Sequence, residues 1–177
     1  MKIARWMGPD GPAEGFVVGD RVVPFAGGTT VAEVLAGCLD AAREAYAAVD
    51  PAGGRPLSEV ALRVPRAPAS IRDFVAFEEH VEGVSGSVDG KNEVVPEWYE
   101  APTFYFTNPH TVRADRETVA IPETRRLDFE LELAVVVGGV PGSDGSNLDA
   151  AAAARHIFGY VLLNDWSARD LQSREMR

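Results

Sequence analysis

The chain has 177 residues, a formal net charge of −10 and an apolar fraction of 46%. These values predict one ordinary globular domain, or a small domain with part of another. The acidic balance argues against nucleic acid or an anionic membrane as a partner, because phosphate binding needs clustered lysine and arginine. The sequence contains no run of eighteen or more apolar residues, so it predicts no transmembrane helix. The N-terminus lacks the apolar stretch of a signal peptide and Cys38 is the only cysteine, so a cytoplasmic setting is expected.

The first 65 residues predict a small β-rich lobe with one helix. Their apolar runs predict three strands, over residues 2–7, 15–18 and 21–25. A two-residue turn containing glycine predicts that the last two strands form a hairpin. Thr30 and Glu33 have the spacing of a helix capping box, and apolar residues at helical intervals predict one helix from there to Val49. No residue of this lobe indicates chemistry.

Two prolines, Pro65 and Pro68, punctuate the connection that follows and predict a domain boundary near residue 66. Apolar residues at helical spacing then predict a helix over residues 70–81, with Asp73 as a carboxylate cap at its start. His80 would lie on the surface of this helix. From these residues alone, capping explains Asp73 and simple exposure explains His80.

Acidic and apolar residues alternate strictly from Asp128 to Leu133, which is the period of a β-strand. Asp128, Glu130 and Glu132 therefore share one face of the predicted strand. Carboxylates two residues apart are separated by roughly 6.6 Å and can converge on one hard cation. A solvated acidic face is the simpler interpretation of this strand on its own.

Three motifs occur together in one order: Arg72-Asp73-Phe74 with His80 beyond it, Asp128–Ala134, and Asn164–Gln172. In this order and spacing they resemble the fumarylacetoacetate hydrolase family, from about residue 70 to residue 177. The resemblance implies an α+β, mainly β fold, a mixed β-sandwich roll with a small N-terminal lobe. The expected domains are the lobe, residues 1–65, and the catalytic domain, residues 66–177.

The resemblance implies a divalent cation, Mg²⁺ or alternatively Ca²⁺ or Mn²⁺, bound by hard carboxylate ligands. The matching positions are Asp73, Glu130, Glu132 and Asp165. Asp128 matches no ligand position and keeps the interpretation of a solvated face. The remaining histidines, His110 and His156, are expected to be structural.

The resemblance also implies the residues that act on the substrate. His80 matches the general base, and the predicted helix places it two turns beyond Asp73, about 10 Å along the axis. Arg169 and Gln172 match donors to an oxyanion, and one helical turn would present both on the same side. Tyr105 matches a substrate-contacting tyrosine.

The implied reaction is hydrolysis of a carbon–carbon bond in a β-diketone or acylpyruvate, such as fumarylacetoacetate, in aromatic catabolism. The expected enzyme is a homodimer that acts on a small diketo or keto acid. Decarboxylation of oxaloacetate, and isomerisation or hydration of keto acids, are alternatives on the same site. Val75 replaces a tyrosine of the fumarylacetoacetases proper, which predicts a different substrate.

The family pattern continues beyond Arg177 with further strands and with a lysine, a threonine and a glutamate near the site. The catalytic domain is therefore expected to be truncated, with an unpaired sheet edge. This feature supports an alternative of another class, a non-catalytic subunit or fragment that needs a partner.

Overall fold

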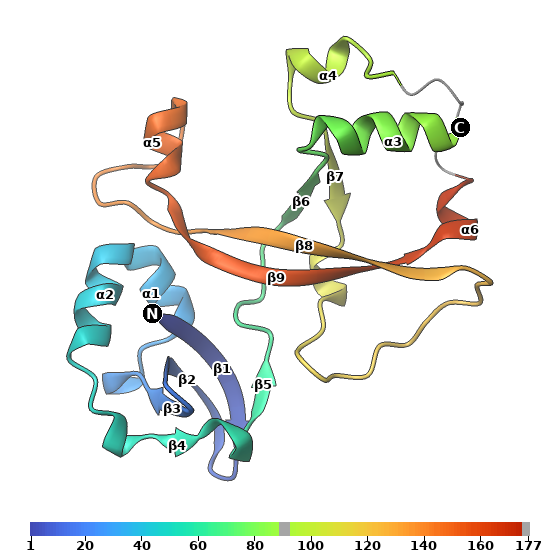
Figure 1. Ribbon diagram of the computed structural model, residues 1–177. Helices are drawn as coiled ribbons and strands as arrows, with labels where there is room; N and C mark the ends of the chain where they lie inside the picture. Colours follow the sequence, from blue (N-terminus) through green and yellow to red (C-terminus); the bar gives the residue numbers. More distant parts are fainter. Residues whose placement is uncertain (89–92, 175–177) are drawn as a thin grey trace. The chain divides into compact units, whose positions relative to one another are not determined.

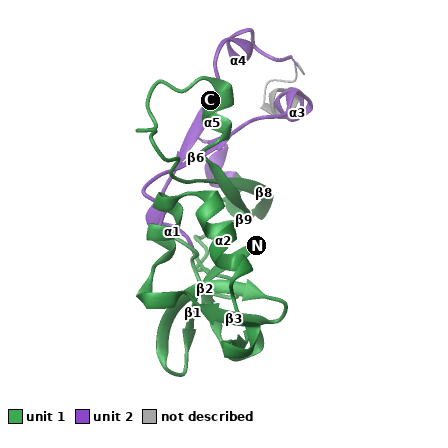
Figure 2. Cartoon of the chain, turned by 90° about the vertical axis from the view of Figure 1, so that its left-hand side faces the viewer, with its two compact units in different colours: residues 1–66, 113–169 green, residues 67–112, 170–177 purple. Residues whose placement is uncertain are grey.

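The computed structural model describes residues 1–88 and 93–174, without the side chains of residues 84–88. These residues form two compact units, which Figure 2 shows in different colours. Unit 1 contains Met1–Arg66 and Arg113–Arg169, and unit 2 contains Ala67–Val112 and the residues from Asp170 onward. The domain boundary expected near residue 66 stays a prediction.

A five-stranded antiparallel sheet forms the N-terminal part of unit 1, with the strand order β4-β3-β2-β1-β5. Its strands are β1 (Lys2–Gly8), β2 (Gly11–Val18), β3 (Arg21–Pro24), β4 (Arg55–Pro56) and β5 (Ala61–Arg63). The three predicted strands are thus present. The predicted hairpin is confirmed as well, because Val18 pairs with Arg21 across the turn and Gly19 adopts a φ of 60°. Glycine adopts this left-handed conformation without steric cost.

The core of this sheet is small and made of apolar side chains from β1 and β3. Ala4, Trp6 and Val22 are buried, and Val22 is wholly inaccessible to solvent. The sheet also contacts a helix, since the ring of Phe16 in β2 meets the ring of Tyr46 edge-on, with 5.3 Å between the ring centroids. Edge-on aromatic pairs add to the stabilisation that burial provides.

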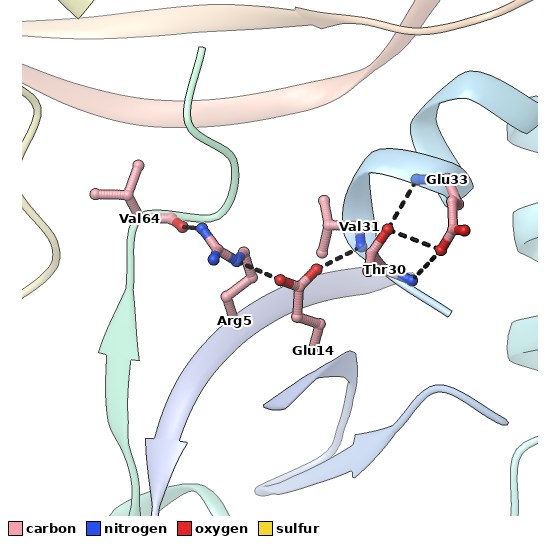
Figure 3. Close-up of polar contacts among 6 residues, drawn as sticks. All are labelled: Arg5, Glu14, Thr30, Val31, Glu33 and Val64. Atoms are coloured by element: carbon pink, nitrogen blue, oxygen red, sulfur yellow. Dashed lines mark hydrogen bonds and ion pairs between the residues drawn. The ribbon is translucent and has the colours of Figure 1, made fainter. Parts of the chain in front are cut away.

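The capping box predicted at Thr30 is confirmed (Figure 3). Helix α1 (Val31–Gly37) begins directly after Thr30, whose hydroxyl accepts a hydrogen bond from the backbone N–H of Glu33. The carboxylate of Glu14 accepts a further bond from the Val31 N–H at 2.6 Å and pairs with Arg5 at 2.7 Å. Both carboxylates lie at the positive end of the helix, where negative charge is stabilising.

The single helix predicted up to Val49 is wrong, because α1 ends at Gly37 and α2 (Leu39–Ala47) follows after extended backbone at Cys38. A continuous helix would bond the Leu39 N–H to the Leu35 carbonyl. The N–H of Gly139 donates to that carbonyl instead, at 2.7 Å. The Leu35 carbonyl, which would accept the next hydrogen bond of a continuous helix, is therefore occupied by Gly139, a distant residue of unit 1.

A long two-stranded antiparallel ribbon forms the rest of unit 1 (Figure 1). It consists of β8 (Leu127–Val137) and β9 (Ile157–Ala168), with the short helix α5 (Ala150–Ala154) between them in the chain. The strand predicted over residues 128–133 is therefore confirmed. Glu130 pairs with Asp165, and the register is regular up to an irregularity at Val136 and Val137.

Unit 2 has a short antiparallel ribbon of β6 (Ile71–Phe74) and β7 (Phe104–Thr107). Its helices are α3 (Glu78–Val88), α4 (Glu97–Glu100) and α6 (Arg169–Gln172), of which α6 starts at the last residue of unit 1. Single 3₁₀ turns complete the two units: η1 (Ala26–Gly28), η2 (Pro51–Gly53), η3 (Leu57–Glu59) and η4 (Pro109–Thr111).

The helix predicted over residues 70–81 is wrong, since its first half is strand β6 and only residues from Glu78 onward are helical. The competing interaction is the pairing with the aromatic strand β7. The rings of Phe74 and Phe104 lie 5.3 Å apart, and the guanidinium of Arg72 lies 4.9 Å from the ring centroid of Phe106. Such cross-strand and cation–π contacts stabilise the extended form over a local helical spacing.

The predicted fold class, α+β and mainly β, is confirmed by these antiparallel sheets with short helices. Within the described ranges, no helix combines the length and the apolar character needed to span a membrane.

Candidate active site

The acidic face of the β8–β9 ribbon brings together three of the four predicted metal ligands. Glu130 and Asp165 are directly paired, and Glu132 lies two residues along the same face of β8. All three residues are half-buried. Directly opposed residues of an antiparallel pair have Cβ atoms about 4.5–5.5 Å apart, so the side chains of Glu130 and Asp165 project side by side from one face.

The geometry of two of these carboxylates fits a divalent cation. One carboxylate oxygen of Glu132 and one of Asp165 lie within 4.8 Å of each other. Two oxygens that bind one ion at about 2–2.5 Å each are at most about 5 Å apart. Their hard oxygen atoms are also the donors that Mg²⁺, Ca²⁺ and Mn²⁺ prefer.

Arg169, the predicted oxyanion donor, contacts the same acidic face. Its Nε donates to Oδ2 of Asp128 at 3.0 Å, its Nη2 forms an ion pair with the same oxygen at 2.9 Å, and its Nη1 donates to Oε1 of Glu130. The backbone N–H of Arg169 donates to the Arg126 carbonyl at 2.9 Å, which anchors the residue at the end of the ribbon. The structure therefore places the predicted substrate-binding arginine beside a predicted ligand.

These contacts change the protonation equilibria of the pair. The Phe129 backbone N–H and then the Arg169 guanidinium hold the pKa of the Asp128 carboxyl below its ordinary value. The hydrogen bond to Glu130 raises the pKa of Arg169. The expectation that Asp128 is only part of a solvated face is incomplete, because the residue accepts a hydrogen bond from Arg169 and forms an ion pair with it. The strand register explains this contact, since it places Asp128 opposite Ser167, two residues before Arg169.

In unit 2, Asp73 and Tyr105 form a directly opposed pair across β6 and β7. Opposed residues point to the same face of a ribbon. Asp73 is half-buried, and Tyr105 is 62% exposed. The predicted fourth ligand and the predicted substrate contact are thus neighbours, although the interpretation of Asp73 as a helix cap is wrong.

His80, the predicted general base, lies in the first turn of α3, where its backbone N–H donates to the Phe77 carbonyl at 3.1 Å. The predicted separation of about 10 Å along one helix is wrong, because Asp73 lies on a strand and His80 on a helix. The side chain of His80 is exposed.

Helix α4 contacts the start of α3, a feature that the sequence analysis missed. The hydroxyl of Tyr99 donates to Oε1 of Glu78, and the indole N–H of Trp98 donates to the Val75 carbonyl at 3.1 Å. The Glu78 carboxylate raises the pKa of Tyr99. Only the aromatic pair in the sequence could have signalled this contact.

Gln172 is the last residue of α6, three positions after Arg169, so the predicted single turn is present. His156 has the structural role that the sequence predicts. Its Nδ1 lies 2.9 Å from the Gly138 carbonyl oxygen, and its Nε2 lies 3.1 Å from the Ser143 hydroxyl.

Comparison with known proteins gives the same assignment as the motifs. Residues 69–177 match the family described as fumarylacetoacetate (FAA) hydrolase, C-terminal. A fumarylacetoacetase of Arabidopsis thaliana is 33% identical over 136 residues, which cover 67% of this chain and 32% of that protein. A fumarylacetoacetase of Rattus norvegicus is 34% identical over 128 residues, covering 61% and 30%. The chain thus aligns with about a third of the length of these curated relatives.

Solved structures share the fold at lower sequence identity. A 5-carboxymethyl-2-hydroxymuconate delta-isomerase from Mycobacterium smegmatis superposes with a TM-score of 0.66 at 22% identity, and the match covers all of this chain and 59% of that one. A 2-hydroxyhepta-2,4-diene-1,7-dioate isomerase from Mycobacterium marinum gives a TM-score of 0.59 at 19% identity, covering 100% and 58%. With the family match over residues 69–177, the chain belongs to the fumarylacetoacetate hydrolase family.

Proposed function

We propose that the protein hydrolyses a carbon–carbon bond in a β-diketone or acylpyruvate, with the aid of a divalent cation. The observation that supports this most is the shared face of Glu130, Glu132 and Asp165, with Arg169 hydrogen-bonded beside them. Asp73 would complete the ligand set, and Mg²⁺ is the proposed ion, with Ca²⁺ or Mn²⁺ as alternatives. When bound, the cation would act as a Lewis acid on the oxygens of the diketone.

The chain's own residues would move the protons. His80 takes a proton from water, and the resulting hydroxide adds to a carbonyl carbon of the substrate. Arg169 and Gln172 donate hydrogen bonds to the oxyanion that forms. The carbon–carbon bond then breaks, the oxyanion becomes a carboxylic acid, and the carbon leaving group receives the proton that His80 took. Tyr105, as the neighbour of Asp73, would orient the substrate.

The names of the relatives support two alternative reactions for the site. Fumarylacetoacetase is the name of the curated relatives, and it favours hydrolysis. Two structural neighbours are named as isomerases, so isomerisation of a keto acid on the same residues is the second candidate. We further propose a homodimer in the cytoplasm with a role in aromatic catabolism, and a catalytic domain that starts near residue 66.

The metal site is tested by isothermal titration of Mg²⁺ into the wild type and into the variant Glu130→Gln/Glu132→Gln. The substitutions keep the shape of both side chains but remove two charged ligands, so binding should be lost. The exposed residue Glu44 on α2 provides the control, and Glu44→Gln should bind Mg²⁺ like the wild type. Equal affinity in the wild type and the double variant would refute the assignment.

The reaction is tested with a panel of acylpyruvates, fumarylacetoacetate, oxaloacetate and isomerisable keto acids, followed by ultraviolet absorbance and product analysis. His80→Ala should keep its Mg²⁺ affinity and lose about 10²–10⁴ in turnover, the usual contribution of a general base. His110→Ala is the matched control and should keep turnover. Unchanged turnover in His80→Ala would exclude His80 as the base. Mg²⁺ binding without conversion of any substrate would favour the alternative of a non-catalytic subunit.

A further inference from the structure

Asp128 is the one acidic residue of the ribbon face to which the proposed function gives no role, yet it has defined contacts. The Nε of Arg169 donates to its Oδ2 at 3.0 Å, and the Nη2 of Arg169 forms an ion pair with the same oxygen at 2.9 Å. The remaining guanidinium nitrogen, Nη1, donates a hydrogen bond to Oε1 of Glu130. The Arg169 side chain is only 25% exposed, against 52% for Asp128 and 34% for Glu130. One partly buried guanidinium is therefore shared by two carboxylates.

This sharing matters because Glu130 has two possible cationic partners, Arg169 and the proposed metal ion. Arginine stays charged at every accessible pH, so deprotonation cannot remove the competition. A guanidinium, however, presents its donors in a fixed fork, so one edge can stay bound to a carboxylate when a donor outside that edge loses its partner. Asp128 binds such an edge, formed by Nε and Nη2.

We propose that Asp128 is a positioning residue that holds Arg169 and thereby keeps Glu130 available for the cation. The inference rests on the proposed metal site and assigns a function to a residue outside the ligand set. Without the Asp128 carboxylate, the Arg169 guanidinium loses one of its carboxylate partners and binds Glu130 more tightly, so a cation must displace it from Glu130. With Asp128 in place, Arg169 keeps an anchor when Glu130 turns to the ion.

A simpler effect predicts part of the same result. Asp128 carries a negative charge on the face that would bind the cation, and loss of any nearby negative charge weakens cation binding through space. That effect does not depend on Arg169. The positioning role does, so a double-mutant cycle between positions 128 and 169 separates the two.

The experiment measures the Mg²⁺ dissociation constant of four proteins: wild type, Asp128→Asn, Arg169→Leu and Asp128→Asn/Arg169→Leu. Residues that orient a metal ligand typically change metal affinity about 10–100-fold, so Asp128→Asn should bind Mg²⁺ about tenfold more weakly than the wild type. In the Arg169→Leu background the same substitution should change affinity less than about twofold. Asp115→Asn is the control, since Asp115 is also an aspartate paired with an arginine, Arg116, but lies outside this face.

Several results would overturn the proposal. An equal loss of affinity in both backgrounds would show a through-space charge effect only, and no loss in either would show no role for Asp128. Arg169→Leu alone must bind Mg²⁺ at least as tightly as the wild type, and weaker binding would contradict the competition even if the Asp128 variants failed to fold. The cycle is repeated with Asp128→Ala, and thermal unfolding establishes that each variant is folded.

Failure of this inference is distinguishable from failure of the proposed function. A wild-type protein that binds no Mg²⁺ refutes the metal site and this inference together. A wild type that binds Mg²⁺, and loses it in Glu130→Gln/Glu132→Gln, but shows no coupling between positions 128 and 169, refutes the role of Asp128 alone.

Discussion

Replacement of Gly139 by alanine should destabilise unit 1 strongly, because α1 and the segment after β8 are in backbone contact there. A Cβ atom at Gly139 would lie 2.2 Å from the carbonyl oxygen and 2.9 Å from the carbonyl carbon of Ala36. Backbone atoms cannot rotate away as the end of a long side chain can. Relief of the clash would also separate the Gly139 N–H from the Leu35 carbonyl, now 2.7 Å away.

The magnitude follows from these two losses. Overpacking at a rigid contact costs about 1–3 kcal/mol, and a lost intramolecular hydrogen bond costs about 1 kcal/mol. The expected decrease in the free energy of unfolding is therefore about 2–4 kcal/mol, a large part of the roughly 5–15 kcal/mol typical of a folded domain. Urea unfolding, followed by circular dichroism, should show the midpoint shifted down by about 1–2 M.

The matched control is Gly37→Ala, at the end of α1. A Cβ there meets no atom within 4 Å, and alanine in a helix is about 0.5–1 kcal/mol more favourable than glycine. This variant should unfold at the same or a higher urea concentration. A loss below about 0.5 kcal/mol for Gly139→Ala, as small as for an ordinary surface substitution, would refute the reasoning, and with it the explanation of the break between α1 and α2.

Two pH-dependent outcomes are also expected. Hydrogen bonds from the backbone and hydroxyl of Thr30 lower the pKa of Glu33, so its contribution to stability is present above the unfolded pKa and is lost as pH falls through the folded one. The difference in thermal midpoint between wild type and Glu33→Gln should shrink at acidic pH, and a constant difference would contradict this. The Glu78 carboxylate raises the pKa of Tyr99, so that stabilisation is present below the unfolded pKa and is lost as pH rises through the folded one. Ultraviolet titration should show Tyr99 ionising at lower pH in Glu78→Gln, and an unchanged titration would contradict the contact.

Features determined by neighbours in the chain could be predicted from the sequence. The capping box needs only Thr30 and Glu33, three residues apart, and the hairpin at Gly19 needs only a short turn between apolar runs. The alternation from Asp128 to Leu133 is equally local, and it established which carboxylates share a face before any partner strand was known.

Features determined by distant partners could not be predicted. The spacing of Phe74, Phe77 and Val81 satisfies a helix, yet residues Ile71–Phe74 pair with an aromatic strand about thirty positions later. A cross-strand partner of this kind has no signature in the local window, so tertiary pairing overrides the local period. The same reasoning applies to the break at Cys38, where the competing hydrogen bond comes from Gly139.

In the candidate site, too, the residue types could be predicted from the sequence, whereas the contacts between distant residues could not. The family resemblance predicts Asp73 as a metal ligand and Tyr105 as a substrate contact, but it does not predict that the two residues are neighbours. Strand register then made them a directly opposed pair. The sequence predicts Asp73 at the start of a helix, and the structure places it on a strand. This difference changes the neighbours of Asp73 but not the carboxylate it offers, because a strand residue faces its cross-strand partner whereas a helix cap faces backbone N–H groups. A carboxylate directly opposite an exposed tyrosine suits the proposed roles of Asp73 as a metal ligand and of Tyr105 as a substrate contact.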